Sequence, residues 1–484
     1  MKNKTLLTDF YQLTMAQGYF ERDKREEAVF DLFYRRNPCG HGYAIFAGLN
    51  QAIDFVNNIE YTEEDLEYLS GQGFNDSFLD YLRDFEFNGD IYAVPEGSVV
   101  FPHEPLLKVK APILQAQLLE TALLNIINHQ SLIATKAARI ATAAKDRAVL
   151  EFGLRRAHGP DAGYYGARAA VIGGCQGTSN VLSGKDFGVN VAGTHAHSWV
   201  MTFDSELEAF RTYARNFPDS CILLVDTYDT LGSGVPNAIK VFEEMEEKGV
   251  DSDLYGIRLD SGDLAYLSKQ ARRMLDEAGF EDATIVASSS LDEDIITSLD
   301  MQDDEIDVFG VGTKLITSST CPSFGGVYKL SAYDGTPKIK ISDNVEKITN
   351  PGDKRLLRLY DRESDKMIAD LMVRNEEVFD ENEDMELFDP RDTWKTTTLA
   401  AGGYRIREMH REVFRDGSCV YEKPEVSEIK EYCEEEKESL WEEYKRLVNP
   451  HIMKVNLSHE LYDLKQELLK VNGVKPGVDG RSDL

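Results

Sequence analysis

Six short apolar runs in the middle of the chain constrain the fold more than any other feature of the sequence. They cover residues 148–152, 189–192, 221–225, 254–259, 284–287 and 306–311. Each run ends in polar or glycine residues, and helical periodicity is visible at residues 204–214, 235–248, 262–278 and 292–299. Successive runs lie roughly 25–40 residues apart, which is enough for a strand and a crossover helix. The repeat predicts a barrel-like α/β sheet of parallel strands, with residues 325–330 as a further candidate strand. An open doubly wound sheet is the alternative.

The regions before and after this repeat have other patterns. Before it we expect a helix starting at Thr8 or Asp9, a strand at 28–34, helices at 48–58 and 62–84, a small β unit at 91–110 and a long helix at 113–144. After it we expect a β-rich segment at 335–372, an acidic loop at 374–393, a charged helix at 426–447, a C-terminal helix at 457–471 and a loose tail of about a dozen residues. The chain therefore divides into three predicted parts, residues 1–146, 147–331 and 332–484, with the active site in the second.

The charge balance excludes several classes of partner. The 484 residues carry a formal net charge of −32, so nucleic acid and anionic membranes are poor partners. An anionic substrate would need a local cluster of arginine, lysine and backbone N–H groups. No apolar stretch approaches the ~20 residues of a membrane span, and no signal peptide is visible. The six cysteines are scattered without CxxC spacing, so we expect reduced thiols in a cytoplasmic protein.

Polar side chains follow each apolar run. Active sites of α/β barrels and open sheets gather at the carboxyl ends of the strands. The residues at these positions are Arg155, Arg156, His195, His197, Asp226, Asp229, Arg258, Asp260, Ser261, Asp263, Ser288, Ser289, Thr313 and Lys314. Paired carboxylates and arginines in one plane predict a site there, although loops are polar in any protein. Arg156 and Lys314 could equally be partners in surface ion pairs.

These residue types favour the chemistry of phosphorylated small molecules. Residues 260–263 precede a helix, whose N-terminal N–H groups and dipole can hold a phosphate. Residues 310–313 bring glycine backbone close to a ligand, as a phosphate-binding turn does. Mg²⁺ that accompanies phosphate groups suits the carboxylates at these strand ends, which are Asp226, Asp229, Asp260 and Asp263. The residues alone therefore indicate an enzyme of phosphorylated metabolites that uses Mg²⁺.

Two of the nine histidines stand two positions apart in residues 191–198. If this run is a strand, its period of two places His195 and His197 on the same face. A histidine at a strand end can be an acid or base, an oxyanion partner or a nucleophile toward phosphorus. The alternative is a pair of loop histidines with ordinary hydrogen bonds, and the pattern by itself does not choose between the two readings.

The chain resembles the nicotinate phosphoribosyltransferase family. The segments that carry the resemblance are TDFYQLTM at 8–15, EFGLRR at 151–156, GTHAHS at 193–198, DTYD at 226–229, IRLDSGD at 257–263, GGVYKL at 325–330 and NPH at 449–451. They occur in the expected order and span most of the chain, without a departure at the matched positions.

The resemblance implies a fold and a reaction. The fold is α/β, an irregular (β/α) barrel with a second α/β domain built from the N-terminal segment and the C-terminal chain. The implied enzyme is a homodimer with active sites shared between subunits. It joins nicotinate to 5-phosphoribosyl-1-pyrophosphate, giving nicotinate mononucleotide and pyrophosphate, the first step of NAD biosynthesis from nicotinate. Hydrolysis of ATP is coupled to this step through a phosphohistidine, and Mg²⁺ is required.

The resemblance also implies roles for single residues. The phosphorylated histidine matches His197, not His195, which becomes a supporting neighbour. Thr194 matches a nicotinate contact and Arg258 a nicotinate- or phosphate-binding arginine. The remaining matches are Tyr11, which is expected to cover the pyridine ring from the neighbouring subunit; Arg155, a partner in related nicotinamide enzymes; Asp260, Ser261, Gly262 and Asp263, around the ribose phosphate and Mg²⁺; and Gly312 and Thr313, at a phosphate-binding turn. From their chemistry, we expect Asp226 and Asp260 to be the metal ligands. Tyr11 could instead be a helix core residue.

Two alternatives remain beside this interpretation. A phosphoribosyltransferase specific for nicotinamide or quinolinate would share most of these motifs. A barrel that binds phosphorylated metabolites without catalysis would show the same polar strand ends.

Overall fold

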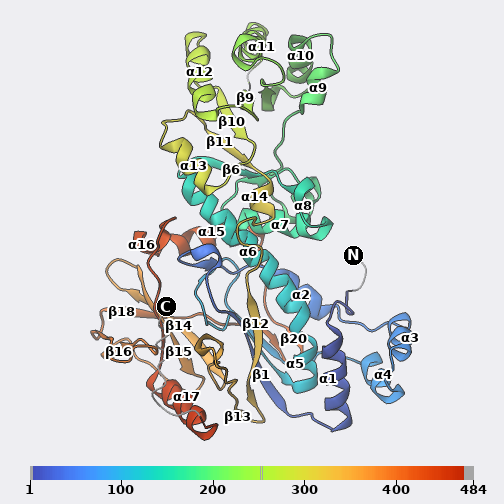
Figure 1. Ribbon diagram of the computed structural model, residues 1–484, viewed down its shortest axis with the longest axis vertical. Coiled ribbons are helices and arrows are strands. Elements are labelled where there is room, and N and C mark those ends of the chain that lie inside the picture. Colours follow the sequence, from blue (N-terminus) through green and yellow to red (C-terminus); the bar gives the residue numbers. More distant parts are fainter. Residues whose placement is uncertain (1–3, 251, 253, 474–484) are drawn as a thin grey trace. The chain divides into compact units, whose positions relative to one another are not determined.

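The computed structural model describes residues 4–250, 252 and 254–473, and the predicted loose tail lies outside this range. The chain forms two compact units. Unit 1 comprises residues 1–132, 323–424 and 431–484, and unit 2 comprises residues 133–322 and 425–430. The division falls inside α6 (Glu120–Ala144). Figure 1 gives the element labels used below.

Unit 2 contains a six-stranded sheet in the order β7-β6-β11-β10-β9-β8, and every neighbouring pair is parallel. The strands are β6 (Ala148–Glu151), β7 (Gly177–Thr178), β8 (Cys221–Leu224), β9 (Tyr255–Leu259), β10 (Thr284–Ser288) and β11 (Val308–Val311). Strands of parallel sheets are covered on both faces and read as continuous apolar runs, which is why the sequence revealed five of these six. The expected α/β fold with a parallel, barrel-like sheet is confirmed, and the sheet forms a half-barrel.

Helices follow the strands of unit 2. They are α7 (Pro160–Gly173), α8 (Val181–Phe187), α9 (His197–Met201), α10 (Glu206–Asn216), α11 (Val235–Glu247), α12 (Leu264–Glu277), α13 (Glu293–Asp300) and α14 (Thr313–Ile316), with short helical turns η2 (Leu154–Arg156), η3 (Pro218–Ser220) and η4 (Thr230–Gly234). The four predicted helices correspond to α10, α11, α12 and α13, and polar side chains cap three of them: Ser205 on α10, Asp263 on α12 and Asp292 on α13.

Residues 189–192 do not form the predicted strand. Val191 makes only an isolated bridge to Thr178, and the dipeptide β7 takes the edge of the sheet. The Val191 residue remains 50% exposed, so this run lacks the two-sided cover that a central strand receives. The prediction was wrong because apolar content alone does not show whether a segment finds a partner strand along its length.

Residues 326–333 form the predicted strand but in the other unit. β12 (Gly326–Tyr333) pairs antiparallel with β1 (Glu27–Tyr34) in unit 1, not with the parallel sheet of unit 2. The partner lies some 300 positions earlier in the chain, so sequence spacing pointed to the nearer sheet.

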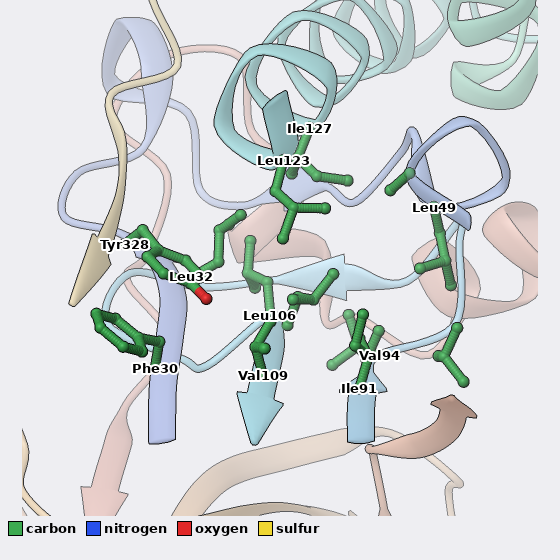
Figure 2. Close-up of a cluster of buried hydrophobic side chains, with 14 of the residues drawn as sticks. Phe30, Leu32, Leu49, Ile91, Val94, Leu106, Val109, Leu123, Ile127 and Tyr328 are labelled. Carbon is green, nitrogen blue, oxygen red and sulfur yellow. The ribbon is translucent and has the colours of Figure 1, made fainter. Parts of the chain in front are cut away.

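Unit 1 is built on a seven-stranded sheet in the order β13-β12-β1-β5-β3-β19-β20, with antiparallel pairs. Its strands beyond β1 and β12 are β3 (Asp90–Ala93), β5 (Leu107–Pro112), β13 (Thr336–Pro337), β19 (Arg411–Arg415) and β20 (Ser418–Cys419). Figure 2 shows side chains from β1, β3 and β5 meeting those of Leu123 and Ile127 from α6. The unit is therefore a sheet with helices on its buried face.

The remaining elements of unit 1 complete this core. The helices are α1 (Phe10–Glu21), α2 (Leu49–Asn57), α3 (Glu63–Gly71), α4 (Asp76–Arg83) and α5 (Ile113–Leu118), with the turns η1 (Pro38–Gly40) and η5 (Val345–Lys347), and a small sheet pairs β2 (Ala44–Ile45) with β4 (Val99–Val100). The predicted helix at 113–144 is interrupted at Leu119, between α5 and α6.

A second sheet of unit 1 gathers C-terminal chain. Its order is β18-β14-β15-β21, from β14 (Lys354–Asp361), β15 (Met367–Arg374), β18 (Tyr404–Glu408) and β21 (Val455–Leu457). The predicted acidic loop contains β16 (Met385–Phe388), paired with β17 (Thr396–Leu399), because Met385, Leu387 and Phe388 are buried. The predicted charged helix is α15 (Val426–Glu438) followed by the separate short helix α16 (Glu442–Lys445), and the C-terminal helix is α17 (His459–Val471).

A buried ion network ties this second sheet to α15. Arg358 on β14 is fully buried and donates to both carboxylate oxygens of Asp370 on β15, at 2.8 and 2.7 Å. It also donates to Glu436 of α15 at 2.7 Å. Each of these three buried charges therefore has an oppositely charged partner, which offsets the cost of removing it from water.

Across the described residues, none of the helices has the length and apolar character to cross a membrane. No disulfide joins any two of the six cysteines, all of which lie in the described part of the chain.

Candidate active site

The carboxyl ends of β8, β9 and β10 bring together residues from four separate segments of unit 2. Three polar groups surround the guanidinium of Arg258, which projects from β9 and is 15% exposed. Nη1 donates to Thr194 Oγ1 at 2.7 Å, Nε to Ser288 Oγ at 3.0 Å and Nη2 to Asp260 Oδ1 at 3.2 Å. A guanidinium has five N–H donors, so two remain for a ligand.

Asp260 stays ionised beside this arginine. Burial by itself raises the pKa of the Asp260 carboxyl, but the hydrogen bond from Ser288 and the charge of Arg258 more than offset it, so the pKa is lowered. Ser288 completes the arrangement, since its hydroxyl contacts Arg258 and donates to Asp260. The strand-end pattern included Ser288 but gave it no role.

Asp226, just after β8, has one carboxylate oxygen engaged and one without a partner. Its Oδ2 accepts from the Asp260 N–H at 3.0 Å and from the Ser261 hydroxyl at 2.6 Å. Its Oδ1 is buried and accepts no hydrogen bond from any described residue. Buried polar atoms of this kind are rare in folded proteins, so Oδ1 is available to a cation or a donor.

His197 is the first residue of α9 and lies over these two carboxylates. Its Nε2 is 4.0 Å from Asp226 Oδ1 and 3.8 Å from Asp260 Oδ2, and its Nδ1 is 3.1 Å from Thr227 Oγ1. The imidazole is 40% exposed, so a reagent can reach it. Thr227 was not predicted as a site residue, although it is the second residue after the predicted strand at 221–225.

His195 has a different position. Its imidazole is buried, and Nε2 accepts the backbone N–H of Leu224 on β8 at 3.1 Å. Burial lowers the pKa of His195 to about 4, so the ring is neutral at physiological pH. The expectation that both imidazoles share one face of a strand is wrong, because residues 192–196 have no strand geometry and α9 starts at His197.

The turn before α12 has the conformation of a helix N-terminus. Gly262 has a φ of +82°, a value that favours glycine, and Asp263 caps α12 by accepting the Tyr266 N–H at 3.0 Å. The Asp263 carboxylate is thus engaged with the helix itself. Ser261 contacts Asp226 through its hydroxyl, so the predicted residues 260–263 lie beside the aspartates and the arginine.

Two further turns pack on one another at the ends of β6 and β11. Gly312 precedes Thr313, the first residue of α14, and a Cβ on Gly312 would lie 3.2 Å from the Phe152 carbonyl oxygen. A Cβ on Gly153 would meet Ile316 at 2.6 Å. Glycine at both positions therefore lets the two loops approach closely.

Arg155 and Arg156 lie on the turn η2 and are exposed. The buried Glu151 holds this turn, since its Oε1 accepts the Gly153 N–H and its Oε2 accepts the Thr178 hydroxyl at 2.6 Å. Sequence reasoning quoted Glu151 within a motif but gave it no role. Among the described residues neither arginine side chain has an ion pair, so both are available to an anion.

Two predicted residues have other surroundings. Lys314 pairs with Asp292, the cap of α13, in agreement with its interpretation as an ion-pair partner. Tyr11 lies on α1 in unit 1 and is 48% exposed, so it is not a core residue of its helix. No group of three or more histidine, cysteine, aspartate or glutamate side chains that could hold a metal occurs in the part of the chain that is described.

The fold and this edge of the sheet define an α/β enzyme of the half-barrel type, with its polar groups at the carboxyl ends of parallel strands. Three family models match the chain: the nicotinate phosphoribosyltransferase N-terminal domain at residues 6–128, the nicotinate phosphoribosyltransferase family at 148–374 and the C-terminal domain at 353–465. The chain belongs to the nicotinate phosphoribosyltransferase family.

Individual relatives agree with this assignment. Nicotinate phosphoribosyltransferase of Bacillus subtilis is 45% identical over 481 residues, covering 98% of this chain and 96% of the relative. The human nicotinate phosphoribosyltransferase sequence is 32% identical and 96% of each chain is covered. The crystal structure of the human enzyme superposes with a TM-score of 0.85 at 31% identity, covering 95% of this chain and 99% of that one. A nicotinate-nucleotide pyrophosphorylase structure from Pyrococcus furiosus, with a TM-score of 0.67 at 22% identity, shares the fold.

Proposed function

We propose that this protein is a nicotinate phosphoribosyltransferase that forms nicotinate mononucleotide and pyrophosphate from nicotinate and 5-phosphoribosyl-1-pyrophosphate. We further propose that ATP hydrolysis is coupled to this reaction. The observation that carries the proposal is the set formed by Arg258, Thr194 and Asp260 beneath the exposed imidazole of His197. Family membership supports the choice of substrates. We also infer a cytoplasmic location from the scattered cysteines of the sequence, which lack CxxC spacing.

Recognition of nicotinate requires a cation for its carboxylate. Arg258 keeps two N–H donors beyond those it gives to protein groups, and its planar fork suits a carboxylate. Nicotinamide cannot offer that charge, so the arginine favours the acid. The pyridine nitrogen carries no proton near neutral pH, so the protein must position the ring but needs no general base.

The phosphoribosyl substrate requires groups that stabilise the departing pyrophosphate. The bond from the ribose carbon to the pyrophosphate oxygen breaks, the electron pair leaves with pyrophosphate, and the pyridine nitrogen bonds to the carbon. We infer that the anion is bound by the exposed side chains of Arg155 and Arg156 and by the backbone N–H groups of Gly312 and Thr313. The backbone N–H groups at the N-terminus of α12 can also bind phosphate oxygens.

The two aspartates fit a Mg²⁺. Asp226 offers the partnerless Oδ1 and Asp260 an ionised carboxylate, and Mg²⁺ typically takes one or two carboxylates together with phosphate oxygens. The ion would neutralise charge on the pyrophosphate. Asp226 also accepts hydrogen bonds from the Asp260 N–H and the Ser261 hydroxyl, so it would position this turn in addition to binding the metal.

We propose that His197 accepts the γ-phosphoryl group of ATP. A ring nitrogen bonds to phosphorus while the bond to the ADP oxygen breaks, and ADP leaves with the electron pair. Asp226 and Asp260 stabilise the charge on the imidazole at 4.0 and 3.8 Å. Water then takes the phosphoryl group, which restores the imidazole and releases phosphate. The added charge on phosphorylated His197 reorganises the groups that bind 5-phosphoribosyl-1-pyrophosphate.

A competition assay tests the substrate. Labelled nicotinate, nicotinamide and quinolinate are each supplied with 5-phosphoribosyl-1-pyrophosphate, and we expect product from nicotinate. Preferential use of another base would support an enzyme specific for that base, and binding without product would support a non-catalytic barrel.

A labelling experiment tests the coupling. With γ-labelled ATP we expect an acid-labile, base-stable phosphate on the peptide that holds His195 and His197, and its loss in His197→Ala. If His197→Ala kept full ATP stimulation of product yield, the phosphohistidine role would be wrong.

We also propose a homodimer with shared active sites. Phe10, Tyr11 and Met15 on α1 are 55%, 48% and 36% exposed, and such apolar surface typically marks an interface. Mass measurement by light scattering should give about twice the 54.5 kDa of one chain. Mixing inactive Tyr11→Ala with inactive His197→Ala should restore activity if Tyr11 acts in the partner's site, and no recovery would contradict sharing.

A further inference from the structure

We propose that His195 is a positioning residue. Its imidazole anchors residues 190–197 to β8 and thereby holds Thr194 and His197 at the active site. The consequence for activity rests on the proposed function, whereas the anchor itself can be measured without it.

Residues 190–195 connect the two edge strands of the unit 2 sheet. At one edge, the Thr178 N–H of β7 donates to the Asn190 carbonyl at 2.9 Å, and the Ala192 N–H donates to the Thr178 carbonyl at 2.9 Å. At the other edge, the Leu224 N–H of β8 donates to His195 Nε2 at 3.1 Å. The segment thus spans the gap in the half-barrel with one anchor at each side.

The anchor at β8 is buried and held by aromatic rings. His195 is 8% exposed, and its ring lies 4.9 Å from that of Tyr213 in an edge-on arrangement and 5.9 Å from that of Phe210. Both rings belong to α10, which packs on β8. Accepting the Leu224 N–H requires an unprotonated Nε2, and burial, which favours the neutral ring, supplies that state.

The anchor has consequences for both neighbours. Thr194 directly precedes His195 and accepts from Arg258 at 2.7 Å, while His197 two residues later contacts Thr227 at 3.1 Å. A Cβ on Gly193 would meet no atom within 4 Å, so packing around this position does not hold the backbone directly before Thr194. Without the His195 anchor, the segment keeps its hold on β7 but loses its placement at the other edge.

Two substitutions separate the hydrogen bond from the packing. His195→Gln keeps an acceptor at a similar distance from the backbone, and His195→Leu keeps apolar bulk without one. The exposed His158, on the loop after η2, provides the matched control in His158→Leu. Hydrogen exchange of the peptide 221–225 reports the anchor, and KM for nicotinate, kcat and γ-phosphate labelling report its effect.

We expect faster exchange at Leu224 in His195→Leu, with KM for nicotinate raised about tenfold or more and labelling of His197 reduced, because small misplacements are costly in catalysis. In His195→Gln, KM for nicotinate should stay within about threefold of the wild-type value, because the glutamine oxygen can still accept the Leu224 N–H. His158→Leu should match the wild type.

The proposal is overturned if His195→Leu folds with wild-type exchange at Leu224 or with wild-type KM and labelling. If His195→Leu fails to fold, His195→Gln provides the test. A folded but inactive His195→Gln protein would overturn the proposal, because this variant keeps an acceptor for the Leu224 N–H. If the wild type made no nicotinate mononucleotide, the proposed function would fail, but the exchange measurement would still test the anchor.

Discussion

Arg258 Nη1 donates a 2.7 Å hydrogen bond to the Thr194 hydroxyl, although the two residues lie 64 positions apart in the chain. The bond connects β9 to the segment that crosses from β7 to β8. It fixes one arm of the guanidinium, while Ser288 and Asp260 fix the others. The arginine is therefore preorganised before any substrate arrives, which reduces the entropy lost on binding an anion.

Replacing Thr194 by valine removes the acceptor for Arg258 and should raise KM for nicotinate about tenfold, because hydrogen bonds to charged groups contribute ~1.5–3 kcal/mol. Thr194→Ser keeps the hydroxyl and should stay close to the wild type. Steady-state kinetics with nicotinate as the varied substrate provide the measurement. Equal kinetics for the valine and serine variants would rule out this role.

Glu151 should act through the turn that carries Arg155. Glu151→Leu frees the Gly153 N–H and the Thr178 hydroxyl, so we expect KM for 5-phosphoribosyl-1-pyrophosphate to rise about tenfold through misplacement of the turn. Glu151→Gln retains an acceptor and is the control. In an Arg155→Ala background, the leucine substitution should add little, because coupled residues are non-additive. Full additivity would show that Glu151 acts elsewhere.

Arg358 should be among the most sensitive positions for stability. Arg358→Met leaves Asp370 buried without its ion-pair partner and removes one of the two arginines that pair with the buried Glu436, which we expect to lower the free energy of unfolding by about 3–5 kcal/mol. The control is Arg83→Ala, which breaks an exposed pair with Glu63 and should cost at most ~1 kcal/mol. Denaturant unfolding followed by circular dichroism measures both, and similar losses for the two variants would contradict the prediction.

Buried neutral histidines should make the protein less stable in mild acid. Burial lowers the pKa of His195 to about 4 and that of His410 to about 3, whereas an unfolded chain has a histidine pKa of about 6.5. As the pH falls below about 6.5, the unfolded state takes up these protons first, so the free energy of unfolding decreases toward pH 4 and is fully retained above pH 7. Thermal unfolding at pH 7 and pH 5 should show a smaller pH-dependent decrease in Tm for His195→Gln. An unchanged decrease would mean that His195 does not contribute.

The sequence predicted most of unit 2 because its central strands are continuous apolar runs. Residues 221–225 and 308–311 have no polar position to face solvent, and such segments fit a sheet that is covered on both sides. The same criterion failed at residues 189–192, where Val191 is half exposed and makes a single bridge. The apolar content of a segment indicates that its burial is favourable, but it does not show which other segment will cover it.

The candidate site was foreseen as a set of strand-end residues, but their pairings were not. That Arg258 and Asp260 would lie near Asp226 follows from parallel strands ending at a common edge, whereas His197 is carried by a segment that is not a strand of this sheet. That Ser288 lies between Arg258 and Asp260 depends on side-chain positions that no motif encodes. Likewise, the partnerless oxygen of Asp226 appears only when the surrounding donors are in place.

The sequence alone determined the parallel α/β sheet, the edge where polar residues gather and, through family motifs, the resemblance to nicotinate phosphoribosyltransferases. These depend on periodicity and residue type, which are local. The tertiary structure decided that β12 joins β1 in unit 1, that Glu151 holds the turn of Arg155, and that His195 is an anchor while His197 is exposed. The reason is physical: burial, pKa and hydrogen-bond partners are set by residues distant in the chain, and only folding brings them within reach.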